Sequence, residues 1–203
     1  MLEILSKGGI LVIPILFCSV LVLAIFFERI IRYAINRSRG KDIEAKVSKL
    51  LKNNDVDKAL KIAKESNSPM GRVLAKAIKA KDLENNVLES VIVNATETEV
   101  SDLSSYIQAL ATIGNIAPLL GLLGTIMGMI KAFMVIQQMG GKVNAAVLAG
   151  GIWEAMLTTA LGLAVALPTM AAHSYLVAKV DKYEARLQNG SVLFLKSIAK
   201  KKV

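Results

Sequence analysis

Residues 111–130 read ATIGNIAPLLGLLGTIMGMI, a stretch without a charged side chain in which small residues recur every three or four positions. This stretch belongs to an uncharged run of 28 residues at 103–130, and two more uncharged runs, of 19 and 24 residues, occur at 9–27 and 155–178. About 20 apolar residues of helix cross the roughly 30 Å hydrocarbon core of a bilayer. The three runs therefore predict three membrane-spanning helices and exclude a soluble enzyme.

The overall composition also favours a membrane protein. The 203 residues are 54% apolar and 5% aromatic, with a mean hydropathy of +0.50 and a formal net charge of +9. Cys18 is the single cysteine of the sequence, which excludes a disulfide scaffold. The positive charge indicates no nucleic-acid partner, because an orientation signal and attraction to anionic lipids at the cytoplasmic surface account for it.

Basic side chains are concentrated in two segments. The segment 28–102 carries 15 Lys and Arg against 12 Asp and Glu, and the tail 179–203 carries 7 against 2. Because Lys and Arg accumulate in cytoplasmic loops, both segments are predicted to be cytoplasmic and the N-terminus to lie outside. The predicted organisation is an outer N-terminus and first membrane helix at 1–27, a cytoplasmic helical domain at 28–102, a second membrane helix at 103–139, a short outer loop at 140–153, a third membrane helix at 154–178 and a basic cytoplasmic tail at 179–203.

The cytoplasmic segment 28–102 shows apolar residues at helical spacing, with polar breaks at 53–55 and 66–69. From Leu83 the pattern continues without Gly or Pro into the second uncharged run, which predicts one long helix. No phosphate-binding glycine loop, no His and Cys cluster and no Ser-His-Asp set occurs in the segment. We therefore expect a helical bundle that is not an enzyme and binds no cofactor or metal.

Small side chains form a stripe along one face of the second and of the third predicted span. In membranes such stripes allow helices to approach closely, because packing drives their association. Close packing alone explains the glycines, so Gly121, Gly124, Gly128 and Gly162 are predicted helix-packing residues. The two stripes are Ala117, Gly121, Gly124, Thr125, Gly128 and Ala132 in the second span, and Thr159, Gly162, Ala166 and Thr169 in the third.

Two threonine hydroxyls near mid-span, at Thr125 and Thr159, admit a functional interpretation. A threonine hydroxyl in a helix can simply donate to the carbonyl one turn back. If the two small-residue faces instead met around a central axis, the hydroxyls would make a narrow polar lining in an apolar tube. Thr125 and Thr159 are therefore candidate pore-lining residues.

Glu154 is the acidic residue at the outer edge of the third span. A carboxylate at the edge of a membrane helix is a functional candidate, although it also favours the positive N-terminal end of that helix. His173, the one histidine of the sequence, lies close to the cytoplasmic interface. We interpret it as an interfacial residue, with a proton-relay role as the alternative.

The interior of the second and third spans lacks a group that titrates near neutral pH. Neither 103–130 nor 155–172 contains Asp, Glu, His, Lys or Arg. A membrane path that conducts protons needs such a group or a continuous chain of waters. If the protein works on protons, a partner must therefore bring the carboxylate.

Two sequence runs and one dipeptide resemble the MotA/TolQ/ExbB proton channel family. The run GNIAPLLGLLGTIMGMI at 114–130, followed by Ala132-Phe133, is similar to the second-span signature of that family. The run IWEAMLTTALGLAVALP at 152–168 is similar to its third-span pattern, and Glu28-Arg29 to the Glu-Arg after its first span. The resemblance covers all three spans and is strongest to the ExbB branch.

The resemblance implies an all-α integral membrane protein of the bacterial inner membrane, with its N-terminus in the periplasm and its C-terminus in the cytoplasm. It implies a homopentameric ring enclosing membrane helices of an ExbD- or TolR-like partner, each with one membrane Asp. In such complexes Thr125 and Thr159 correspond to pore-lining residues and Glu154 to the acid at the pore mouth. Proton flow through them would energise a TonB- or TolA-like protein that spans the periplasm.

Three alternatives remain open at the level of the sequence. A TolQ-like subunit would energise a Tol-Pal-type envelope system, a passive scaffold would use the small stripes for packing alone, and a gated channel would conduct without a partner. The missing titratable group argues against the channel that works alone. Nothing in the sequence distinguishes protons from sodium ions.

Overall fold

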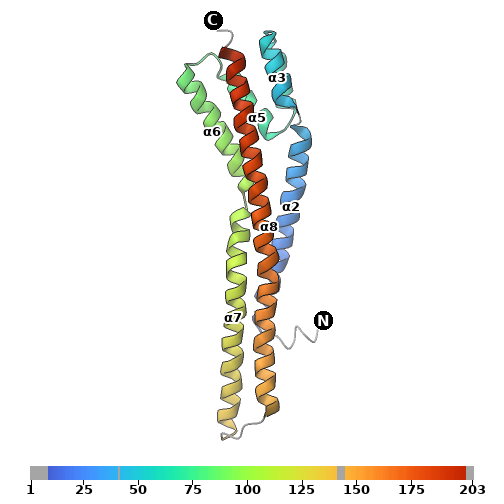
Figure 1. Cartoon of the computed structure of the whole chain (residues 1–203), viewed down its shortest axis with the longest axis vertical. Coiled ribbons are helices and arrows are strands. Elements are labelled where there is room, and N and C mark those ends of the chain that lie inside the picture. The colour runs from blue at the N-terminus through green and yellow to red at the C-terminus, as the bar shows by residue number, and fades with distance from the viewer. Residues whose placement is uncertain (1–8, 41, 141–144, 200–203) are drawn as a thin grey trace. The chain divides into compact units, whose positions relative to one another are not determined.

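The computed structural model describes residues 9–40, 42–140 and 145–199, and these residues are helical apart from short connections (Figure 1). Among them, three helical stretches are long and apolar enough to cross a membrane: Val12–Asn36, Asn85–Gln138 and Leu148–Ile198. The prediction of an all-α protein with three long apolar helices is confirmed. The helices are α2 (Val12–Arg39), α3 (Ile43–Lys52), α4 (Val56–Glu65), α5 (Pro69–Lys79), α6 (Asn85–Ser104), α7 (Ile107–Gln138) and α8 (Ala145–Ala199).

The chain divides into two compact units. The first unit comprises Met1–Phe27 and Tyr106–Tyr175, and the second comprises Glu28–Ser105 and Leu176–Val203. The three uncharged runs fall almost entirely in the first unit, so we name it the apolar unit. The second unit contains the C-terminal part of α2, α3 to α6 and the C-terminal part of α8, and we name it the helical bundle.

The helical bundle forms around the short helices that the sequence predicts. α3 ends before the polar break at 53–55, and α4 ends before the break at 66–69, so both predicted breaks are confirmed. Each helix buries one apolar face in a common core, to which α8 contributes Leu187 and Phe194. Asp55 stands at the N-cap position of α4, but its carboxylate pairs with Lys58 instead of bonding a backbone amide.

Two ion pairs join different helices of the bundle. The guanidinium of Arg72 contacts both carboxylate oxygens of Glu99, which is almost fully buried, at 2.5 to 3.0 Å. That contact raises the pKa of Arg72 despite partial burial, so the arginine keeps its charge. Arg186 of α8 pairs with Glu44 of α3 at 3.2 Å. These pairs connect α5 to α6 and α8 to α3.

The prediction of one unbroken helix from Leu83 through the second uncharged run is wrong. α6 ends at Ser104 and α7 begins at Ile107, because Ser105 is extended and Tyr106 has a left-handed backbone with φ 62°. Neither residue is Gly or Pro, so periodicity gave no sign of the break. Side chains from α2 compensate the interrupted hydrogen bonding at this point.

The third apolar helix is longer than the predicted span of 154–178. α8 begins at Ala145, inside the segment predicted as a loop at 140–153, and continues to Ala199 through most of the predicted tail. Helix formers such as Ala145, Ala146 and Leu148 favour this early start. Positions 1–8, 141–144 and 200–203, parts of the predicted N-terminus, loop and tail, lie outside the described residues.

The first turn of α5 gives a prediction about the stability of the bundle. The fully buried Ser68 is the N-cap, its Oγ accepts from the Gly71 amide at 3.1 Å, and Pro69 occupies the first helical position. We expect Ser68→Ala to destabilise the bundle by about 1 kcal/mol, since a buried cap bond is lost. Amide hydrogen exchange in α5 measures the effect, and the exposed Ser90, bonded to Asn86 within α6, gives the control Ser90→Ala. Equal exchange in the two variants would contradict the assignment.

Candidate functional site

The predicted small-residue faces of the second and third spans pack against each other in the apolar unit, where α7 and the first part of α8 lie side by side (Figure 1). The small residues buried on α7 recur at helical spacing, which places them on one face. The small residues buried on α8 also recur at helical spacing and lie on one face. They are Gly114, Ala117, Gly121, Gly124, Gly128 and Ala132 on α7, and Ala155, Thr158, Gly162, Ala166 and Thr169 on α8.

Glycines bring the two backbones into contact. A Cβ atom at Gly162 would lie 2.6 Å from the Ala117 carbonyl oxygen and 3.1 Å from the Gly121 Cα. A Cβ atom at Gly121 would lie 2.9 Å from the Thr159 Cα, and one at Gly128 would lie 3.0 Å from the Ala155 Cβ. Distances below about 3.0 Å are sterically forbidden, so the approach of the helices depends on the missing side chains.

Thr125 and Thr159 both lie close to Gly121 but donate to different backbone carbonyls. The Thr159 hydroxyl donates across the helix interface to the Gly121 carbonyl at 3.0 Å. The Thr125 hydroxyl, one helical turn after Gly121, donates within its own helix to the Leu122 carbonyl at 2.6 Å, and Thr125 is partly buried. The contact of Thr159 on α7 therefore lies within about one helical turn of Thr125.

Thr158 is a residue of this interface that the sequence reasoning missed. It is 2% exposed, its hydroxyl donates to the Ala155 carbonyl at 2.7 Å, and it occupies the space that the absent Gly124 side chain leaves. The contact face of α8 therefore runs through Thr158, and Thr159 lies at its edge. The spacing from Ala155 to Thr158 to Gly162 was the signal that could have located it.

Glu154 forms an ion pair that the sequence reasoning did not anticipate. Its Oε1 lies 3.1 Å from Nζ of Lys131, which comes from the end of α7, and both side chains are partly exposed. Gly9, with φ 69°, lies directly against the same carboxylate. The two residues flank the uncharged runs at 103–130 and 155–178, so an antiparallel pair of helices brings them to the same end.

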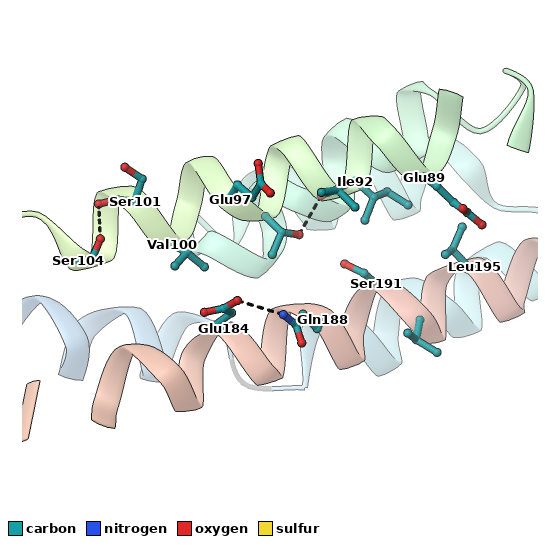
Figure 2. Close-up of a pocket in the computed structure, with 13 residues that line it drawn as sticks. Glu89, Ile92, Glu97, Val100, Ser101, Ser104, Glu184, Gln188, Ser191 and Leu195 are labelled. Carbon is teal, nitrogen blue, oxygen red and sulfur yellow. Dashed lines mark hydrogen bonds between the residues drawn. The ribbon is translucent and has the colours of Figure 1, made fainter. Parts of the chain in front are cut away.

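The helical bundle contains a separate groove of about 620 Å³ between α6 and the C-terminal part of α8. Figure 2 shows Ile92 and Val100 on one wall and Ser191 and Leu195 on the other, with the Gln188 amide donating to Glu184 at 3.1 Å. Among the residues that the structure describes, no group of three or more His, Cys, Asp or Glu side chains could hold a metal ion. The groove is apolar with acidic edges and has no arrangement of catalytic groups.

Comparison with known protein families finds a match that includes the residues of the small-residue interface. A model of the MotA/TolQ/ExbB proton channel family matches residues 65–189, which include all of α7 and the part of α8 that packs on it. The chain belongs to the MotA/TolQ/ExbB proton channel family. The resemblance that the runs at 114–130 and 152–168 indicated is thereby confirmed.

Two ExbB-named proteins are similar over most of the chain, and a TolQ protein is similar over less than half of it. The putative biopolymer transport protein ExbB-like 3 of Synechocystis is 31% identical over 165 residues, covering 80% of this chain and 78% of that protein. The biopolymer transport protein exbB1 of Vibrio cholerae is 27% identical over 184 residues, or 89% of this chain and 81% of that protein. The Tol-Pal system protein TolQ of Haemophilus influenzae is 35% identical over 91 residues, or 44% of this chain and 39% of that protein.

Proposed function

We propose that this chain is the ring-forming subunit of a proton channel in the bacterial inner membrane. Together with an ExbD-like partner, it would convert the proton motive force into mechanical work on a TonB-like protein for import across the outer membrane. Membership of a proton channel family and the similarity to proteins named for biopolymer transport support this proposal.

The apolar interior of the two packed helices is the observation that carries the proposal. α7 and α8 contact each other through Gly, Ala and Thr, and neither 103–130 nor 155–172 contains a side chain that titrates near neutral pH. Such a surface can position a charged group but cannot itself carry a proton. We therefore infer that a single-span partner brings the membrane carboxylate, and that the protein works as a complex.

The candidate site residues take complementary roles in this proposal. Thr159 and Thr125 would hydrogen-bond the partner carboxylate or its water. Glu154 would attract cations at the periplasmic mouth once its pair with Lys131 opens. The four glycines, Gly121, Gly124, Gly128 and Gly162, would hold the helices close enough for these groups to reach the path.

The outer surface of the apolar unit supports assembly with other chains. Large apolar side chains of α7, including Leu119, Leu122 and Phe133, are more than half exposed in the single chain. Such a surface must be covered by lipid or protein. A homopentamer with the N-terminus in the periplasm and the C-terminus in the cytoplasm, in contact with anionic lipids, accounts for this cover and for the basic cytoplasmic segments.

The energetics require several protons for each working stroke. One charge that crosses the membrane gains about 2.3 kcal/mol per 100 mV of potential. A single proton would therefore supply little more than the energy of one or two hydrogen bonds. Repeated transfers, each coupled to a displacement of the partner within the ring, would accumulate enough work to act on a periplasm-spanning protein.

A second candidate is a TolQ-like subunit that energises a Tol-Pal-type envelope system through a TolA-like protein. The observation that favours it is the 35% identity to Haemophilus influenzae TolQ over 91 residues. The two candidates share the same channel chemistry and differ in the protein that receives the work. Growth under iron limitation tests the first function, and outer-membrane integrity in detergent tests the second.

Proton flux into liposomes distinguishes a channel from a passive scaffold. We expect the chain to give proton flux only when it is reconstituted together with its single-span partner, because the carboxylate is missing from its own spans. A pH-sensitive dye inside the vesicles, under an imposed potassium diffusion potential, reports the flux. Flux without the partner would indicate a channel that works alone, and no flux with the partner would indicate a scaffold. Replacing external protons by a sodium gradient identifies the ion.

A further inference from the structure

The end of α6 is stabilised by the hydroxyl groups of two local serines and by side chains of α2. A helix that ends leaves its last carbonyl groups without backbone donors. Here Ser104 and Ser105 both donate to the Ser101 carbonyl, at 3.0 and 3.2 Å. The next two carbonyls, those of Asp102 and Leu103, accept from α2. The carbonyls of three successive residues before the break are therefore satisfied by side chains.

Two residues of α2 provide these distant bonds. Arg29 donates from Nη1 to the Asp102 carbonyl at 3.2 Å and to the Leu103 carbonyl at 3.5 Å. The hydroxyl of Tyr33 donates to the same Leu103 carbonyl at 2.7 Å. The two donors lie four residues apart, so they project from one face of α2. Together they bond the carbonyl groups at the C-terminal end of α6.

Both side chains of α2 that bond the end of α6 are buried. Arg29 is fully buried and Tyr33 is 7% exposed. A buried arginine is costly unless its charge is compensated. Here the Glu28 carboxylate lies 2.6 Å from Arg29 Nε, and the negative end of the α6 dipole faces the guanidinium. The apolar residues Leu103 and Ile107 on either side of the break are also buried, so water cannot replace the donors there.

The backbone at the break is in an unusual conformation. Tyr106 adopts its left-handed backbone without being Gly, a conformation that persists only when its surroundings enforce it.

We propose that Arg29 and Tyr33 are positioning residues that fix the residue at which α6 ends, and thereby the residue at which α7, the helix that carries Gly121 and Thr125, begins. This inference deepens the proposed function and rests on it for its effect on proton flux, whereas the local structural effect is independent of function. Arg29 and Tyr33 would affect proton flux only indirectly, through α7, and would not contact the proton path.

Amide hydrogen exchange of the full chain in lipid nanodiscs tests the local effect. Arg29→Met should increase exchange of the amides at 101–104 about 10- to 100-fold, because hydrogen bonds from a charged donor are lost. Tyr33→Phe, which keeps the ring, should give a smaller increase of about 3- to 10-fold. Arg29→Lys keeps the charge and should restore part of the protection. Arg32→Met removes a half-buried arginine from the same helix and serves as the matched control.

The pattern of exchange distinguishes a positioning role from a general structural one. The proposal predicts faster exchange confined to the end of α6, with α3 to α5 unchanged and with reduced partner-dependent proton flux in a complex that still assembles. Equal effects of Arg29→Met and Arg32→Met, or faster exchange throughout the bundle, would overturn it. If Arg29→Met does not fold, Tyr33→Phe and Arg29→Lys decide the question. The exchange result stands even if the unmodified complex conducts no protons.

Discussion

Replacing Gly162 with leucine is expected to separate α7 from α8 and to abolish assembly of the protein. The Cβ alone would lie 2.6 Å from the Ala117 carbonyl oxygen and 3.1 Å from the Gly121 Cα, and both atoms belong to a helix backbone. A flexible side chain could rotate away from such a clash, but a helix backbone can only move as a whole. We therefore expect a loss well above the roughly 1–3 kcal/mol that overpacking usually costs.

Gly150 provides the matched control for this experiment. It belongs to the same helix, and a Cβ atom added there would meet nothing within 4 Å. Gly150→Leu should therefore leave folding unchanged. Size-exclusion chromatography in detergent measures the assembled fraction, and the fluorescence of Trp153, the one tryptophan of the sequence, reports unfolding during a detergent titration. Similar behaviour of the two leucine variants would contradict the packing model.

Replacing Thr159 with valine is expected to preserve assembly and to reduce partner-dependent proton flux strongly. Valine matches threonine in shape but cannot donate to the Gly121 carbonyl, a bond of 3.0 Å in the structure. Interhelical hydrogen bonds in membranes contribute only about 0.6–2 kcal/mol, so the helices should remain packed. If the hydroxyl also serves the partner carboxylate, its loss should reduce flux about 10- to 100-fold.

Two further variants complete the test of Thr159. Thr159→Ser retains the hydroxyl and should retain most of the flux. Thr112→Val removes a hydroxyl that bonds the Gln108 carbonyl on the exposed side of α7, and it should have little effect. If Thr159→Val conducts as well as the unmodified protein, Thr159 is a packing residue only. If assembly fails in Thr159→Val but not in Thr159→Ser, the interhelical bond is essential for folding.

The sequence predicted the interface between the spans better than it predicted the contacts at that interface. Small residues at helical spacing can pack only against a close neighbour, which is why the buried face of α7 coincides with the predicted stripe. The side chain of Thr158, by contrast, fills a space whose size depends on Gly124 of another helix. Periodicity within one helix assigns residues to a face within about one position, and an error of one position exchanges Thr158 for Thr159.

The end of α6 was missed for a different physical reason. The break at Ser105 and Tyr106 follows no local signal, because neither residue is Gly or Pro. Its hydrogen bonds come from Arg29 and Tyr33, which lie more than 60 residues earlier in the chain. Hydrophobic periodicity predicts a helix wherever the spacing of apolar residues continues. Hydrogen-bond donors from distant parts of the chain can nevertheless end the helix at a point that the periodicity does not mark.

The amino-acid sequence by itself determined the three apolar helices, the family and the absence from 103–130 and 155–172 of a side chain that titrates near neutral pH, since these depend on composition and spacing alone. Only the tertiary structure decided that Glu154 pairs with Lys131, that Thr159 bonds the backbone of Gly121, and that α6 ends at Ser104. Each of these features joins residues from different helices. Their energies depend on distances of a few ångströms between groups that are far apart in the chain.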